Sequence, residues 1–151
     1  MRIFFVIALS GLILSLAFAG CSQSGNLSGL SPCDGTVTYN GSSVTGAILT
    51  FYPDSSTGRA ASAITDANGK FKTTTLKPED GIAPGNYKVT VIKFEEYGDL
   101  PSKVKNDDGE MVQPPRDQRN SLPKKYENPT DSGLTVTIAQ GKNTENFELT
   151  D

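Results

Sequence analysis

The 151-residue chain contains no histidine and no tryptophan, and it has only two cysteines and two methionines. The absence of histidine removes the commonest general base near neutral pH and the usual nitrogen ligand of zinc. The sequence also lacks a run of Lys and Arg long enough to follow a phosphate backbone, and its 17 acidic residues exceed its 14 basic ones. We therefore expect no nucleic-acid partner, no metal, no cofactor and no catalytic residues.

Helix-favouring runs are scarce as well, whereas Thr, Gly, Asn and Ser are plentiful. Short segments of alternating apolar and polar residues are separated by turn residues, which is typical of an all-β protein. The length allows one domain, because domains commonly contain about 100 to 150 residues.

Residues 1–20 have the pattern of an export signal. A short basic end, Met1-Arg2, precedes an apolar run over 3–19 that is interrupted only by small residues. The run is slightly short for a membrane-spanning helix, which needs about 20 apolar residues, and no basic cluster follows it. We therefore predict that 1–20 is a signal peptide and not part of the folded domain.

The signal ends in Leu-Ala-Phe-Ala-Gly-Cys at 16–21, which resembles the lipobox of bacterial lipoproteins. Phe18 departs from that pattern, because Leu is commonest at its position. The resemblance implies that Cys21 carries a diacylglyceryl group and palmitate-type acyl chains, and that it becomes the first residue of the mature chain. The partner would then be a membrane, held through the lipid on Cys21. Ser22 lacks the Asp-type signal for inner-membrane retention, which favours the outer membrane.

An ordinary secretory site is the alternative, since Ala17-Phe18-Ala19 also fits the small-x-small cleavage rule and would release a soluble protein beginning at Gly20. The two readings differ on Cys33. A free Cys21 thiol allows a Cys21–Cys33 disulfide in an oxidising envelope, whereas a lipidated Cys21 leaves Cys33 without a partner. We interpret Cys33 as a buried residue that enters the first strand. Residues 21–32 have the composition of a flexible tether.

Residues 33–151 are predicted to form a seven-stranded antiparallel β-sandwich. The strand over 87–94 is the most apolar and is expected to be central, and Asp66 to Gly69 are expected to join two strands as a hairpin. The seven predicted strands begin near Gly35, Ala47, Ala60, Lys70, Tyr87, Leu134 and Phe147.

A long polar segment over 95–131 interrupts the sandwich and is either functional or disordered. Tyr97 and Tyr126 within it are candidate contacts for a partner, although packing of Tyr126 on the sandwich beside Leu122 is the simpler interpretation. Asp66 and Asn68 have oxygen ligands that suit calcium, but turn capping explains them better. Residues 106–110 are interpreted as a solvated acidic loop.

The order of several short motifs resembles the transthyretin-like, carboxypeptidase regulatory-like domains of bacterial envelope lipoproteins. The resemblance runs from about Asp34 to the C-terminus. It depends on the residues at 35–41, 44–47, 50–53, 65–71, 84–89, 122–126 and 132–134.

This resemblance implies a prealbumin-like sandwich that acts as an accessory or binding module. The hydroxyisourate hydrolase of the same fold depends on histidines, which this chain lacks. We therefore expect a non-catalytic, membrane-anchored envelope module that interacts with a protein. A carbohydrate or cell-wall polymer binder is the alternative, and a hydrolase is a distant one.

Overall fold

The computed structural model describes residues 29–151 and is all-β, with twelve strands and one short 3-10 helix. Cys21, the predicted signal peptide 1–20 and most of the predicted tether 21–32 lie outside the described residues. Within 29–151, no helix has the length and apolar character needed to span a membrane.

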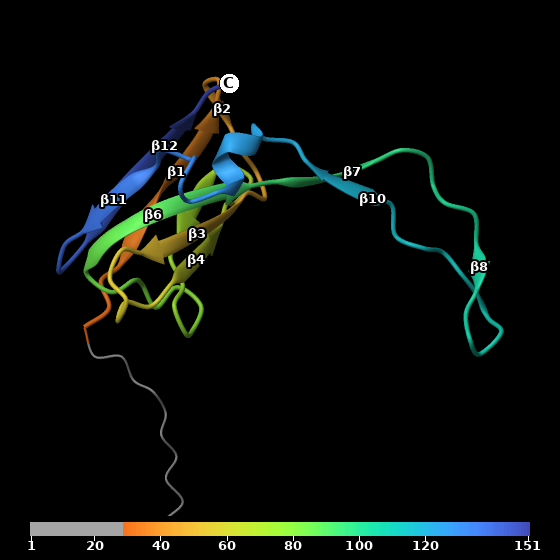
Figure 1. The fold of residues 1–151 in the computed structure, drawn as a ribbon, viewed down its shortest axis with the longest axis horizontal. Helices are drawn as coiled ribbons and strands as arrows, with labels where there is room; N and C mark the ends of the chain where they lie inside the picture. Colours follow the sequence, from red (N-terminus) through yellow and green to blue (C-terminus); the bar gives the residue numbers. More distant parts are fainter. Residues whose placement is uncertain (1–28) are drawn as a thin grey trace, which may run out of the picture.

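Eight strands form two packed sheets (Figure 1). In the first sheet the central strand has one neighbour along its whole length on one side and two short neighbours on the other. Its strands are β12 (Asn143–Leu149), β1 (Cys33–Tyr39), β2 (Ser42–Ser43) and β5 (Lys70–Lys72). The second sheet has the order β11 (Thr135–Ile138), β6 (Gly85–Ile92), β3 (Ile48–Pro53) and β4 (Ala61–Ile64). The apolar strand β6 is therefore internal, as predicted.

The core lies between the two sheets, where alternate residues of each strand point inward. Its centre is a group of four aromatic rings whose contacting centroids are 5.9 to 6.5 Å apart. The rings belong to Phe51, Phe71, Tyr87 and Phe147. Because two of them come from each sheet, this cluster holds the layers together.

The predicted all-β sandwich is confirmed, but its description as seven antiparallel strands was wrong in two respects. The short strand β2 makes the number eight, and β12 pairs with β1 in parallel, from Cys33 opposite Asn143 to Tyr39 opposite Leu149. Alternation predicts which side chains face the core, but it carries no information about strand direction. The direction follows from the turn after β11, which carries the chain into the other sheet.

The predicted hairpin around Asp66 to Gly69 was also wrong in its pairing. The turn exists, but β4 pairs with β3 and β5 pairs with β1, so the two strands lie in different sheets. An isolated bridge pairs Ser62 of β4 with Thr74, which lies just beyond the end of β5. This division places Ala61 and Ala63 in the same core as Phe71 but on the opposite sheet, and the local sequence does not show this arrangement.

The domain begins before Cys33, because Ser31 is buried and forms a β-bridge with Ile82. Cys33 itself is 3% exposed and opens β1. The interpretation of Cys33 as a core residue at the start of the first strand is confirmed.

The segment predicted as one long polar loop is not a loop throughout. It forms two antiparallel ladders that project from the sandwich (Figure 1). The ladder near the sandwich pairs β7 (Phe94–Tyr97) with β10 (Asp117–Asn120), and the ladder at the tip pairs β8 (Val104–Lys105) with β9 (Met111–Val112). We call residues 94–120 the arm. These strands are too short for an alternation of apolar and polar residues to be detected in the sequence.

After the arm the chain returns to the sandwich through the 3-10 helix η1 (Lys124–Glu127). Leu122 and Tyr126 are 7% and 4% exposed and belong to the core. The Tyr126 hydroxyl donates to the Thr150 carbonyl oxygen and accepts from the Thr150 N–H, both at 3.0 Å. The predicted packing of Tyr126 on the sandwich beside Leu122 is therefore confirmed.

Candidate functional site

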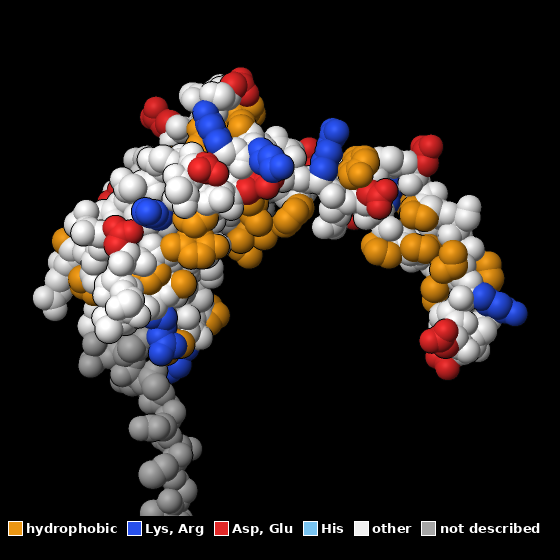
Figure 2. All heavy atoms as spheres, viewed as in Figure 1, with side chains coloured by type: hydrophobic (Ala, Val, Ile, Leu, Met, Phe, Trp, Pro, Cys, Tyr) orange, Lys and Arg blue, Asp and Glu red, His pale blue; other side chains and the backbone are white. Residues whose placement is uncertain are grey.

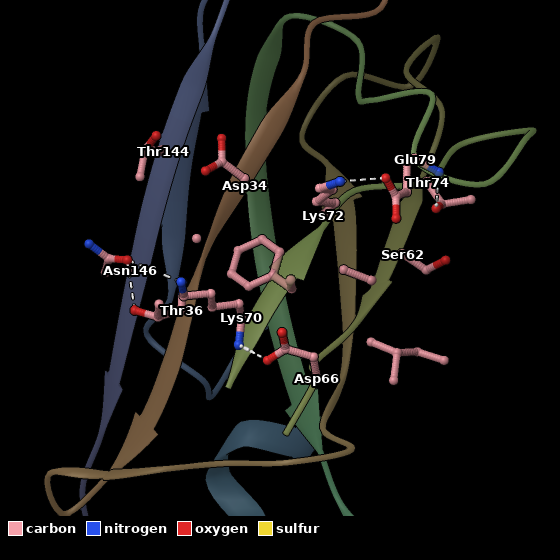
Figure 3. A pocket seen from close by; sticks show the side chains of 14 residues that line it. Asp34, Thr36, Ser62, Asp66, Lys70, Lys72, Thr74, Glu79, Thr144 and Asn146 are labelled. Carbon is pink, nitrogen blue, oxygen red and sulfur yellow. Dashed lines mark hydrogen bonds and ion pairs between the residues drawn. The ribbon is translucent and has the colours of Figure 1, made fainter. Parts of the chain in front are cut away.

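Two surfaces stand out, and the first is a polar groove of about 710 Å³ between the outer face of the first sheet and the edge strand β4 of the second sheet (Figure 3). It exists because β12, β1 and β5 turn their polar residues outward while the alternate residues enter the core. The polar side chains that line it are Asp34, Thr36, Ser62, Asp66, Lys70, Lys72, Thr74, Glu79, Thr144 and Asn146.

The charges of this groove are largely matched within it. Lys72 Nζ lies 2.6 Å from Glu79 Oε2, and the hydrogen bond and charge of Glu79 raise the pKa of Lys72. Lys142 Nζ lies 3.8 Å from Asp34 Oδ1 at one margin. Thr36 donates both its backbone N–H and its hydroxyl to Asn146 Oδ1, at 3.1 and 2.8 Å. The members of these three pairs therefore satisfy one another's charges or hydrogen bonds.

Glu79 has a left-handed backbone with φ of 60°, which is uncommon for a residue with a side chain. The loop that holds it is organised by Asp80, whose carboxylate accepts N–H bonds from the three residues Thr75, Leu76 and Lys77. Desolvation works to raise the pKa of Asp80, but these hydrogen bonds outweigh it and lower the pKa. Glu79, which pairs with Lys72 at the rim of the groove, therefore lies on a loop that the hydrogen bonds of Asp80 hold in place.

The groove has little of what carbohydrate recognition or catalysis requires. The one aromatic residue lining it, Phe71, is 3% exposed, so it offers no ring for a sugar to stack on. Its carboxylates Asp34 and Glu79 each lie beside a lysine and do not converge on a common point. This geometry does not favour the carbohydrate alternative.

The turn-capping interpretation of Asp66 is confirmed. Asp66 Oδ1 accepts the N–H groups of Asn68 and Lys70, at 2.8 and 2.9 Å. In the acidic tip loop, Asn106 Oδ1 likewise accepts the N–H of Glu110 at 2.7 Å. No group of three His, Cys, Asp or Glu side chains in residues 29–151 is placed to hold a metal ion.

The arm is the second surface, and it is apolar to a degree that its sequence does not suggest. Of the nine large hydrophobic residues that are exposed in residues 29–151, six lie on the arm. They are Phe94, Tyr97, Leu100, Val104, Met111 and Val112, with exposures from 38% to 63%. Figure 2 shows hydrophobic side chains along the arm and on the sandwich beside the base of the arm.

The ladder at the base of the arm is fixed by contacts of charged side chains. Lys93 Nζ lies 2.9 Å from Glu95 Oε1, and this hydrogen bond and charge lower the pKa of Glu95. On the same face of the ladder as Glu95, the guanidinium of Arg119 lies 5.5 Å from the centre of the Tyr97 ring. These contacts hold the base of the arm extended while its apolar side chains stay exposed.

Of the two tyrosines predicted as partner contacts, the structure leaves one accessible. Tyr97 is 45% exposed on the arm, whereas Tyr126 is buried and is no contact for a partner. Cys21, the predicted lipidation site, lies outside the described residues. The sequence alone did not identify Leu100 and Met111 as candidate contacts for a partner, because isolated apolar residues in a polar segment form no repeating pattern. The one available signal was the presence of large apolar residues in an otherwise charged segment.

Comparison with models of known protein families gives no match, and comparison with curated proteins gives none either. Two solved structures show a distant likeness, each with a TM-score of 0.38. One is a 9R-lipoxygenase from Cyanothece PCC8801, at 12% identity over 81% of this chain and 16% of that one. The other is a DUF3823 family protein from Parabacteroides merdae ATCC 43184, at 17% identity over 78% of this chain and 44% of that one. The chain spans less than half of either protein, and likeness at this level assigns neither a family nor an activity.

Proposed function

We propose that the chain is a non-catalytic, membrane-anchored module of the bacterial cell envelope that binds a protein partner through its arm. The observation that carries this proposal is the concentration of exposed apolar side chains on residues 94–120. Exposed apolar side chains gathered on one segment mark interaction sites in soluble domains, because leaving them in water is unfavourable.

The form of the arm supports a protein contact over a purely structural role. The strands of the arm contribute no buried hydrophobic residue to the core, whereas Leu122 and Tyr126, directly after it, do. A projecting ladder with aromatic and aliphatic side chains provides both anchor residues and exposed strand edges, which are common means of protein recognition.

The membrane anchor rests on the sequence at 16–21, with Cys21 as the lipid-bearing residue. Two or more acyl chains hold a protein firmly, at about 0.8 kcal/mol for each buried methylene group. The protein surface itself is anionic, since the residues after 20 carry 17 acidic and 13 basic side chains. The lipid therefore supplies the attachment that anionic head groups would not.

Photo-crosslinking in living cells tests the role of the arm. A photoactivatable phenylalanine analogue replaces Leu100, which is 63% exposed, in the full chain. We expect a discrete protein adduct, because a bound partner holds one surface against this position. Introducing Met111→Ser and Val112→Ser should reduce the adduct roughly tenfold, the effect of losing about 1.4 kcal/mol of binding free energy.

The matched control places the same analogue at Thr144, which is exposed on the outer face of the first sheet. Thr144 should give no discrete adduct. Absence of an adduct at Leu100, or equal adducts at the two positions, would contradict the proposal.

A further inference from the structure

The chain has a second, partly exposed apolar surface, on the outer face of the second sheet, where Ile64 is exposed and Ile48 and Ile92 are half-buried. Ile48 pairs with Ile64 on one side and with Ile92 on the other, so three isoleucines form a row across three strands. Their outward direction follows from the alternate residues Leu49, Ala63 and Val91, which are buried in the core. Ile64 is 66% exposed, the largest exposure of any big apolar residue in 29–151.

We infer that the partner of the arm is a second copy of this chain, and that each arm packs on the isoleucine row of the other copy. This inference rests on the proposed function of the arm and specifies its partner. A two-fold pair places the same patches of both copies in contact, so one arrangement covers both apolar surfaces of each chain at once. A partner that contacted the arm alone would leave Ile64 in water.

Charge complementarity supports this pairing. The arm carries seven acidic and four basic residues. Within residues 29–151, five of the seven, namely Asp99, Asp107, Asp108, Glu110 and Asp117, have no ion-pair partner. The outward positions of the second sheet carry no acid and one lysine, Lys88. These positions are Ile48, Thr50, Tyr52, Ser62, Ile64, Asn86, Lys88, Thr90, Ile92, Thr135 and Thr137, of which Thr90 is buried.

The outer face of the first sheet is a poorer match for the arm. It presents both acids, Asp34 and Glu148, and lysines, Lys70 and Lys72, among its outward residues, and it has no comparable apolar row. Lys72 and Lys142 of this face are already paired with Glu79 and Asp34, so the face offers the acidic arm little unmatched positive charge. A bilayer is also a poor match, since Asp107, Asp108 and Glu110 lie at the tip beside Val104 and Met111.

Co-purification of two differently tagged copies of the full chain, extracted from the same membranes in mild detergent, tests the inference. We expect the copies to co-purify, and the Leu100 photo-adduct to be a dimer whose crosslinked peptide contains β3, β4 or β6. Ile64→Lys should reduce both signals roughly tenfold, because it places a charge in the apolar contact. Thr144→Lys is the matched control, since both residues are exposed on the outer faces of edge strands, and it should leave both signals unchanged.

The other outcomes separate the two proposals. A Leu100 adduct with a different protein, without co-purification of the copies, overturns the second-copy inference and leaves the proposed protein-binding function standing. A dimer adduct that persists in Ile64→Lys overturns the assignment of the isoleucine row. Absence of any protein adduct at Leu100 overturns both proposals.

Discussion

The thiol of Cys33 shows how one buried residue links stability to pH. Desolvation by burial, followed by the charges of Glu145 and Asp34, raises the pKa of Cys33 to about 11 from an ordinary value of 9.0. The folded state therefore favours the neutral thiol, and a thiolate is a poor state for this position. The side chain is a core residue in chemical terms as well as in position.

The raised pKa of Cys33 predicts a loss of stability at high pH. The contribution of Cys33 to the free energy of unfolding is fully present below pH 9, where the thiol is protonated in both the folded and the unfolded state. This contribution is lost as the pH rises toward 11. Between these values the unfolded state releases the proton more easily, at a cost to folding of about 2 kcal/mol. Urea unfolding at pH 8 and pH 11 should show that Cys33→Ala loses less stability over this interval than the parent chain. An equal loss in both proteins would contradict the prediction.

Tyr126 fixes the point where the chain rejoins the sandwich after the arm. Its hydroxyl satisfies both the N–H and the carbonyl oxygen of Thr150. Removing it in Tyr126→Phe leaves these two backbone groups without that partner, so we expect a loss of about 1 to 2 kcal/mol in the free energy of unfolding. Urea denaturation measures the difference.

The matched control for this change is Tyr97→Phe, at an exposed tyrosine on the arm. It should change the free energy of unfolding by less than about 0.5 kcal/mol, as surface substitutions do. If the two variants were equally stable, the anchoring role assigned to Tyr126 would be wrong.

Among the structural elements, the turn between β4 and β5 does more than reverse the chain, because it transfers it from one sheet to the other. Gly69 lies in this turn with φ of +74°, and a Cβ there would come within 2.7 Å of the Val37 carbonyl oxygen. The position therefore requires glycine for two reasons, the backbone conformation and the lack of space.

Gly69→Ala should lower the free energy of unfolding by about 2 kcal/mol or more, since strain and a clash with the backbone of β1 add together. Gly133→Ala provides the control, because Gly133 has a similar φ of +67° and nothing within 4 Å of the added Cβ. It should cost only the conformational strain, about 1 kcal/mol. Thermal or urea unfolding of both variants gives the comparison, and equal losses would exclude the proposed clash.

On the scale of the whole molecule, the predicted anchor at Cys21 and the arm have complementary roles. The anchor confines the chain to a membrane, and confinement raises the effective concentration of neighbouring copies. Weak contacts between an arm and an isoleucine row would then be sufficient for association. The proposals for the anchor and for the second copy thus support one another physically, although separate experiments test them.

Cys21→Ala should release the chain from the membrane anchor. Intact mass spectrometry of the parent protein, purified from bacterial membranes, should give the mass of residues 21–151 plus acyl groups, and this mass should be absent from the variant. A mass that begins at Gly20 without acyl groups would contradict lipidation, and a further deficit of two hydrogens would indicate a Cys21–Cys33 disulfide.

The sequence by itself determined the all-β class, the positions of the main strands and the inward faces, because alternation and turn residues act locally. It also determined that Tyr126 packs beside Leu122. Only the tertiary structure decided that β12 runs parallel to β1 and that β4 and β5 separate into two sheets, because pairing depends on residues that are distant in the sequence. The same reason explains the isoleucine row, which joins Ile48, Ile64 and Ile92 from three strands. The arm is apolar and exposed only because the folded chain leaves it outside the core.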